Sequence, residues 1–174
     1  VVSRNRVIAT TVTGRLAAYD AFRGEERWAY RLGDPSERWI FSSPLIDSEQ
    51  VYVGHARHFV CIDAATGERI WLRDDLRGAD WISSYSSPAA DDATVYTGFF
   101  WHPETLWALD RRSGVTRWVI DGNGKDAGPA GTPVLELAPK GVATPRLAEV
   151  AYVVCHDGIM RAIAPIDGST LWQF

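Results

Sequence analysis

Four histidines are the residues of this 174-residue chain whose type and spacing could bind a metal ion. They follow short apolar segments that predict strands, and they are His55, His58, His102 and His156. The spacing of His55 and His58 is one that metal ligands use. No cluster of Cys or carboxylate residues accompanies them, and the tips of separate hairpins diverge. We therefore expect no metal site here, and polar turn residues in solvent.

Aromatic residues gather in the same hairpins and connections. The set comprises Trp39, Trp81, Tyr85 and Trp101. Exposed aromatic rings beside His and Arg suit contact with a peptide, a loop or another domain. The alternative is that these rings cover the ends of a wedge-shaped core. Together with the four histidines they form the predicted contact surface.

Catalytic motifs are missing from the sequence. There is no Ser/His/Asp elbow, no phosphate-binding loop and no Gly-rich dinucleotide fingerprint. The two cysteines, Cys61 and Cys155, do not make a disulfide framework and lie inside apolar strand patterns. A free Cys in that setting behaves as a small hydrophobic residue. The sequence therefore predicts no catalytic residues.

An eleven-residue repeat predicts the strands and turns that position these side chains. In the copy from Cys61 to Trp71, Asp is third, Gly is seventh and Trp is last. The repeat residues are Asp20, Gly24 and Trp28; Asp63, Gly67 and Trp71; Asp110, Gly114 and Trp118; and Gly168 and Trp172, with Ala164 in the Asp position. The Trp residues that end successive copies of the repeat are 43, 47 and 54 positions apart. A period of about 40 to 50 residues predicts the blades of a β-propeller.

Each repeat residue has a structural reason to be there. The Gly lies in a turn where a positive φ is expected. The Trp offers a large flat surface to the next blade, together with an N–H group that needs an acceptor. The Asp, at a strand end, can accept hydrogen bonds from backbone N–H groups of its own turn. We interpret these residues as architecture and not as an active site.

Short β-rich segments separated by turns predict an all-β chain of four-stranded antiparallel blades with almost no helix. The expected blades are residues 1–34, 38–78, 81–124 and 129–174 of a single domain. The first is expected to be incomplete, because residues 1–3 resemble only the end of an opening strand. The last is lengthened by an insertion at 138–145.

The repeat resembles the tryptophan-docking motif of the quinoprotein-like (PQQ-like) β-propeller family. This family includes pyrroloquinoline-quinone (PQQ) alcohol dehydrogenases and the propeller lipoprotein of the outer-membrane barrel assembly machinery. The resemblance covers essentially the whole chain and implies a ring of seven or eight blades. About four are expected here. The chain is thus predicted to be part of a longer ring, or a half-ring that pairs with a second copy.

The resemblance also implies what a quinone site would need. Its dehydrogenases hold PQQ under a vicinal Cys pair and over a Trp, with Glu, Asn and Asp around a calcium ion. Here Cys61 and Cys155 are not adjacent, and Asn occurs only at Asn5 and Asn123. We therefore expect neither PQQ nor calcium, and both remain part of the alternative interpretation.

Composition limits the partners. Apolar residues make up 46% of the chain and the net charge is −4, which gives no reason to expect nucleic acid. No apolar run is long enough to cross a bilayer. The resemblance favours a periplasmic or secreted location. The predicted function is a non-catalytic propeller module that binds a protein partner or a fused domain. The alternative is part of a PQQ-dependent dehydrogenase or of a ligand-sensing propeller.

Overall fold

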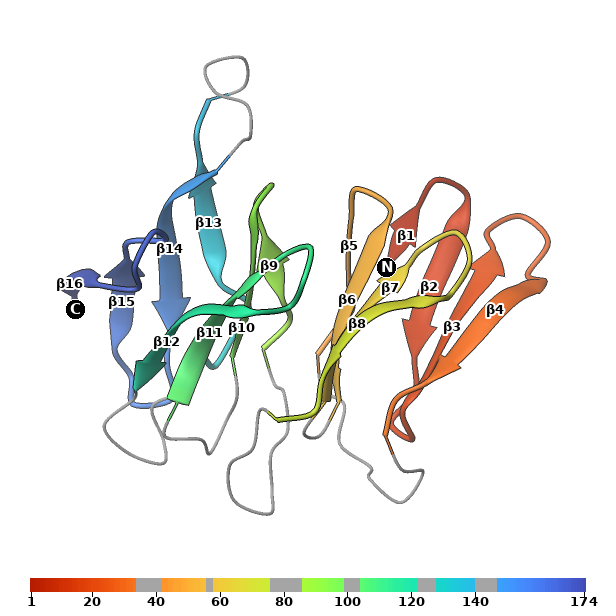
Figure 1. Cartoon of the computed structure of the whole chain (residues 1–174), viewed down its shortest axis with the longest axis horizontal. Helices are drawn as coiled ribbons and strands as arrows, with labels where there is room; N and C mark the ends of the chain where they lie inside the picture. The colour runs from red at the N-terminus through yellow and green to blue at the C-terminus, as the bar shows by residue number, and fades with distance from the viewer. Residues whose placement is uncertain (34–41, 56–57, 76–85, 99–103, 122–127, 140–146) are drawn as a thin grey trace.

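The computed structural model describes residues 1–33, 42–55, 58–75, 86–98, 104–121, 128–139 and 147–174 (Figure 1). In these ranges every regular element is a strand, and the strands form four separate four-stranded antiparallel sheets. No described helix has the length and apolar character that a membrane span requires. The predicted all-β architecture is confirmed.

The first two sheets follow one another along the chain, and we call them blade 1 and blade 2. Blade 1 contains β1 (Val2–Ser3), β2 (Arg6–Thr10), β3 (Arg15–Asp20) and β4 (Glu26–Arg31). Blade 2 contains β5 (Leu45–Asp47), β6 (Gln50–His55), β7 (His58–Asp63) and β8 (Arg69–Arg73). Each strand pairs with the next one in sequence, so each blade is a simple meander.

Blades 3 and 4 repeat this order. Blade 3 contains β9 (Ala89–Ala90), β10 (Thr94–Gly98), β11 (Glu104–Asp110) and β12 (Thr116–Asp121). Blade 4 contains β13 (Val134–Leu137), β14 (Ala148–Val154), β15 (Met160–Ile163) and β16 (Thr170–Gln173). In blade 1, residues 1–3 are expected to form only the end of an opening strand, and β1 lies there. Its β1 is as short as β9, two residues in each case.

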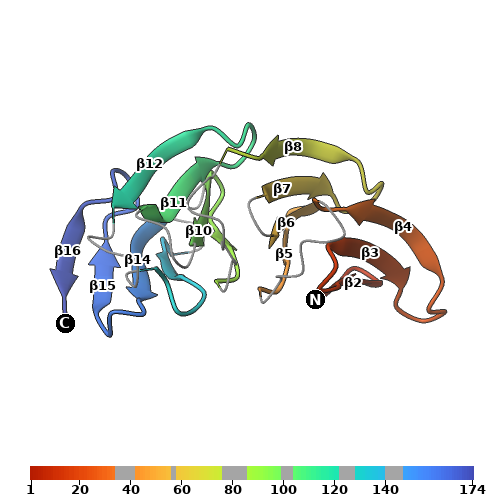
Figure 2. The same cartoon turned by 90° about the horizontal axis from the view of Figure 1, so that it is seen from below.

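The four blades lie side by side along an open arc (Figure 2). Strands β4, β8, β12 and β16 lie on its outer side, and the earlier strands of each blade lie further in. The described blades do not close into a ring, as expected for part of a larger propeller. Blades 1 and 4 form the two ends of the arc, and their outward faces look to the same side.

The hydrophobic core is divided into three clusters, one between each pair of neighbouring blades. Because side chains alternate along a strand, each blade supplies one face to the preceding blade and one to the following blade. Between blades 1 and 2, Ile8, Ala18 and Trp28 pack against Val51 and Ile62. The other two clusters centre on Tyr52, Cys61 and Trp71, and on Tyr96, Ala108 and Trp118. The core is thus a row of sheet-on-sheet interfaces.

Two tight hairpins turn through positive φ without glycine. Arg4 and Asn5 have φ of 44° and 66° between β1 and β2, and Ser48 and Glu49 have φ of 47° and 65° between β5 and β6. Positive φ at both central residues is the pattern of a type I′ turn, whose twist matches that of paired strands. The turns therefore fix the register of the first hairpin in blades 1 and 2.

Candidate functional site

The contact that recurs between blades joins a Trp of one blade to a turn of the next. Trp28, in β4, donates its Nε1–H to the carbonyl oxygen of Ala64 at 3.0 Å. A Cβ on Gly67 would lie 2.7 Å from the indole ring, and Gly67 has φ of +78°. Both facts require glycine at this position. We call this arrangement, a Trp ring on the Gly turn of the following blade, a joint.

Two further joints repeat the geometry. Trp71 donates to the carbonyl oxygen of Arg111 at 3.0 Å, and Trp118 donates to that of Pro165 at 2.8 Å. A Cβ on Gly114 or Gly168 would lie 2.8 Å from the respective ring. The three docked Trp side chains are only 8 to 9% exposed. Each joint thus buries an aromatic ring and satisfies its N–H group.

The repeat Asp residues hold the turns in shape. Asp63 Oδ1 accepts the N–H groups of Ala65 and Thr66 at 2.9 and 2.8 Å. Asp110 Oδ1 likewise accepts from Arg112 and Ser113. Hydrogen bonds from backbone and hydroxyl groups lower the pKa of Asp63 against the opposing effect of burial. In blade 4, Ala164 stands at this position and Asp167 accepts the N–H of Ser169 instead.

The remaining two turn carboxylates are strongly acidic. A hydrogen bond from Arg27, supported by the N–H groups of Arg23 and Phe22, lowers the pKa of Asp20 to about 2. For Asp110, burial alone would raise the pKa. Hydrogen bonds from Arg117, Ser113 and Arg112 outweigh it, so that its pKa is also about 2. These carboxylates are ionised structural acceptors, not proton donors at neutral pH.

The two ends of the arc each carry half of a joint. Trp172 of blade 4 is 46% exposed, in contrast to the three docked Trp residues. Its ring lies 5.9 Å from that of Tyr152, the same separation as between Tyr96 and Trp118. At the other end, a Cβ on Gly24 would meet no atom within 4 Å. Blade 4 therefore presents a Trp, and blade 1 presents a Gly turn.

The outward face of blade 4 carries several exposed apolar side chains, together with Glu136, which accepts a hydrogen bond from the Tyr152 hydroxyl at 2.8 Å. Strand alternation places on it, with Trp172, the side chains of Val134, Val154, Met160 and Phe174. These residues are 63, 53, 37 and 95% exposed. On the same face of blade 2, Phe59 and Trp71 are buried by blade 3. A contiguous exposed apolar surface of this kind marks a contact surface.

Arg111 fastens blade 3 to blade 2. It is 5% exposed, and its guanidinium donates to the hydroxyl of Tyr52 at 2.9 Å and to the backbone oxygens of Asp47 at 3.0 Å and Asp91 at 2.7 Å. It also forms an ion pair with the Asp47 carboxylate at 2.6 Å. Sequence reasoning missed this residue. Its one signal is an Arg directly after the repeat Asp, where the other blades have Ala or Pro.

Asp91 fastens blade 3 to blade 4 and was also missed. It is 4% exposed. Oδ1 accepts from the N–H groups of Ala93 and Thr94, and Oδ2 accepts from the Tyr96 hydroxyl and from the N–H of Ala148 in β14. A buried carboxylate with this many donors is fully satisfied. Its role is therefore to connect the two blades.

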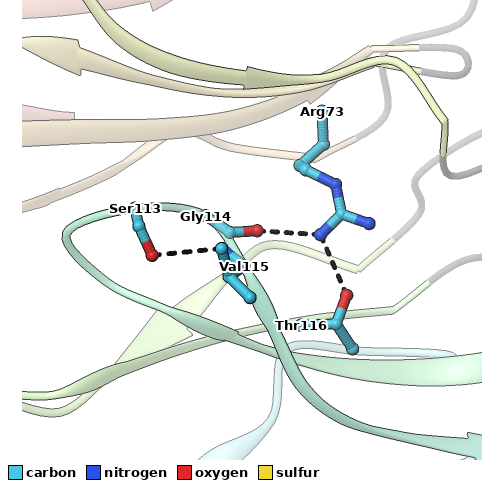
Figure 3. A pocket seen from close by; sticks show the side chains of 5 residues that line it. All are labelled: Arg73, Ser113, Gly114, Val115 and Thr116. Carbon is cyan, nitrogen blue, oxygen red and sulfur yellow. Dashed lines mark hydrogen bonds between the residues drawn. The ribbon is translucent and has the colours of Figure 1, made fainter.

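A hollow of about 340 Å³ lies between β8 and the β11–β12 turn (Figure 3). Its lining is Arg73, Ser113, Gly114, Val115 and Thr116. Arg73 donates to the Gly114 carbonyl oxygen at 2.8 Å and to the Thr116 hydroxyl at 2.9 Å, and it pairs with Asp75. The Arg73 side chain thus connects β8 of blade 2 to the β11–β12 turn and β12 of blade 3.

Three of the predicted contact residues can be placed. His55 and His58 face each other across the β6–β7 hairpin, and His156 is exposed in the turn after β14. His55 is fully buried against Gly14 of blade 1, so the expectation that it lies in solvent is wrong. The other predicted residues, Trp39, Trp81, Tyr85, Trp101 and His102, lie outside the described residues. Among those described, no three His, Cys, Asp or Glu side chains form a group that could hold a metal ion.

The described cysteines do not fit the quinone site that the family resemblance implies. Cys61 lies in blade 2 against Trp71, and Cys155 lies in blade 4 within the third core cluster. Burial raises the pKa of the Cys61 thiol to about 12 and also raises that of Cys155. Both are buried core residues in separate blades, so Cys61 and Cys155 do not form the vicinal pair that this site needs.

Comparison with known proteins agrees with this geometry. The family described as outer membrane protein assembly factor BamB matches residues 1–118, more than half of the chain. The chain belongs to this BamB family of PQQ-like propeller repeats. No curated protein matches the sequence significantly.

Solved structures show a likeness of fold over the whole chain. BamB from Moraxella catarrhalis is 20% identical, with a TM-score of 0.67, and the match covers 97% of this chain and 49% of that one. The quinohemoprotein alcohol dehydrogenase from Comamonas testosteroni is 15% identical, with a TM-score of 0.78, and the match covers 100% of this chain and 34% of that one. A europium-containing methanol dehydrogenase is 16% identical, with a TM-score of 0.75, and the match covers 99% of this chain and 40% of that one. At these identities the likeness is one of fold, and the chain spans less than half the length of each structure.

Proposed function

We propose that this BamB-family chain is a non-catalytic propeller module that mediates contact with a protein partner or a fused domain. The observation that carries the proposal is the pair of unlike open faces at the ends of the arc. One face presents Trp172 on an apolar surface, and the other presents the open turn at Gly24. Exposed apolar sheet faces of this kind are typical of sites that pack against another blade or another protein.

The proposed setting is extracytoplasmic. Its support is the matched family, whose description names an outer membrane protein assembly factor. Partners of the proposed module include other proteins, a domain of the same protein, and further copies of the chain. The proposal does not include nucleic acid, because the chain is mildly acidic.

A photo-cross-linking experiment tests the contact function. The chain carries p-benzoylphenylalanine in place of Trp172 or, as a control, in place of Val115. Val115 is 62% exposed but lies in the β11–β12 turn, away from both ends of the arc. We expect protein adducts from position 172 and not from position 115, with the adduct site mapped by mass spectrometry and reproduced with purified components. Equal labelling at both positions, or none at 172, would contradict the proposal.

The alternative function is part of a quinone-dependent dehydrogenase or of a ligand-sensing propeller. Its support is the fold likeness to two alcohol-oxidising enzymes. The test is to mix the purified chain with PQQ and Ca²⁺ and to follow quinone absorbance and alcohol-dependent reduction of a dye. We expect neither uptake nor activity. Binding of one equivalent of PQQ would favour the alternative.

A further inference from the structure

We infer that the two open faces are complementary halves of one joint, and that a second copy of this chain fills both. In the resulting ring of eight blades, Trp172 of each copy lies on the Asp20–Gly24 turn of the other. This inference rests on the proposed contact function and names its partner. It adds two intermolecular joints to the three joints already present within each chain.

The Trp half of this joint is already in docking position. Trp172 lies 5.9 Å from Tyr152 with an interplanar angle of 43°, and docked Trp71 lies 6.0 Å from Tyr52 at 44°. Trp172 also pairs with Ala162 in register, as docked Trp118 pairs with Ala108. Its ring therefore already lies against its own blade as the docked rings do.

The Gly half has the backbone shape of the occupied turns. Gly24 has φ of +71°, beside +78°, +73° and +77° for Gly67, Gly114 and Gly168. Its N–H donates to the Asp20 carbonyl oxygen at 2.9 Å, as Gly67 does to Asp63 at 2.9 Å. What differs is occupancy, because each of the other three glycines is covered by a Trp ring and Gly24 is open. The turn of blade 1 is thus preformed for an indole.

The rest of the blade 1 face also fits a neighbouring blade. Val7 pairs with Tyr19 and Ala9 pairs with Ala17, at the register positions where blade 2 has Val51 with Ile62 and Val53 with Val60. These blade 2 residues are fully buried against blade 1. On this outward face of blade 1, Ala9 is exposed and Val7 and Tyr19 are half-buried, whereas Ala17 is already buried. Arg15, which binds the Tyr19 hydroxyl at 2.9 Å, lies beside them and pairs with Glu26.

The shape of the arc favours a second copy as the occupant. The outward faces of blades 1 and 4 look to the same side of the arc (Figure 2). A two-fold rotation therefore brings each Trp half onto a Gly half, and the head-to-tail contact closes instead of growing into a filament.

The mass of the 174-residue chain in solution tests the inference. We expect twice the single-chain mass of 19.3 kDa by light scattering or sedimentation at concentrations on the order of 10 μM. Trp172→Ala should weaken the dimer by about a hundredfold, as for loss of a buried aromatic anchor. Cross-links in the wild-type dimer should join residues near Trp172 of one copy to residues near Gly24 of the other.

Gly24→Asn tests the contact between the two copies more specifically than Trp172→Ala does. Asn tolerates the left-handed backbone of this turn, so the blade should fold, but its Cβ occupies the space that a docked indole needs. The matched control is Gly158→Asn, because Gly158 has φ of +79°, has open space around it and follows β14 away from every joint. We expect Gly24→Asn to be monomeric with an unchanged circular dichroism spectrum, and Gly158→Asn to remain dimeric.

Three outcomes would overturn the inference. They are a wild-type monomer, a dimer that survives both Trp172→Ala and Gly24→Asn, and an open polymer. The two proposals can fail separately. A wild-type monomer whose position 172 still cross-links to a different protein overturns the ring and keeps the contact function. A chain with no specific cross-link at that position loses both.

Discussion

At the scale of single residues, the joint combines three requirements in one place. The indole N–H of Trp71 needs an acceptor, its ring needs a flat surface, and the turn opposite needs a positive φ without a side chain. The Arg111 carbonyl oxygen and Gly114 supply what the following blade must provide. Because each requirement constrains a different atom, the contributions of Trp and Gly can be separated by mutation.

Trp71→Ala should lower the free energy of unfolding by about 3 to 5 kcal/mol, because it leaves a large cavity between blades 2 and 3. Trp71→Phe keeps a ring but removes the bond to the Arg111 carbonyl oxygen, and should cost about 1 to 3 kcal/mol. Urea unfolding measures both. A loss below about 1 kcal/mol for the alanine variant would mean that the ring is not docked.

Gly114→Ala should destabilise the fold more than Gly158→Ala. Both positions have a positive φ, but only at Gly114 would the new Cβ lie 2.8 Å from a docked ring, that of Trp71. The control variant should lose about 1 kcal/mol through backbone strain alone. The excess loss at Gly114, measured by denaturant unfolding, reports the fit of the joint. Equal losses would show that only the backbone conformation matters.

At the scale of elements, the blades are held together by more than the joints. Arg111 reaches from the β11–β12 turn to the β5–β6 turn of blade 2, and Asp91 accepts a hydrogen bond from β14 of blade 4. Near the start of the same blades, the N–H of Ser43 donates to the Ser87 hydroxyl, and the Ser86 hydroxyl donates to the Gly131 carbonyl oxygen. Blade 3 is therefore tied to both neighbours at several points.

Arg111→Ala should reduce the free energy of unfolding by about 3 kcal/mol, because it removes one partner of a buried ion pair and leaves several acceptors without a donor. Arg112→Ala is the matched control. Arg112 is exposed, and its backbone N–H would still donate to Asp110. We expect a change within about 0.5 kcal/mol for that variant. Similar losses in thermal unfolding would refute the role given to Arg111.

At this scale the sequence predicts the blades, but not the side chains of Arg111 and Asp91 that connect them. The Trp period and the short strands identified the blades, because both follow directly from residue types and spacing. Strand β1 (Val2–Ser3) lies where residues 1–3 predict the end of an opening strand. Arg111 and Asp91 form hydrogen bonds with backbone atoms of neighbouring blades. Because any residue type offers such backbone atoms, the positions of residue types in the sequence do not reveal these partners. His55 was misplaced because Gly14 of the neighbouring blade allows a turn residue to be buried.

At the scale of the whole molecule, the repeated carboxylates couple stability to pH. The pKa values of Asp20 and Asp110 fall from 3.8 to about 2, and those of Asp63 and Asp157 are also lowered. Because these pKa values lie below those of the unfolded chain, the ionised form stabilises the fold. This contribution is complete above about pH 4 and is lost as the pH falls towards 2.

The thermal midpoint should therefore change little between pH 7 and pH 5 on account of these groups, and fall steeply between pH 4 and pH 2. Asp110→Asn provides the control. Its amide oxygen can still accept from Arg112 and Ser113, but it does not titrate in this range. That variant should show a shallower acid loss in calorimetry. An identical acid profile would place the titrating groups elsewhere.

The joint also bears on how such a chain can change in evolution. Blades 1 to 3 each meet the next blade through the same Trp-on-Gly contact, whatever else differs between them. A duplicated or deleted gene segment that encodes one whole repeat restores a matched contact on both sides, so no interface has to be reinvented. Blade number can then vary by unequal recombination, while the surface turns diverge independently. Because the joint between blades is the same throughout, the surface turns can change to bind new partners without altering how the blades pack.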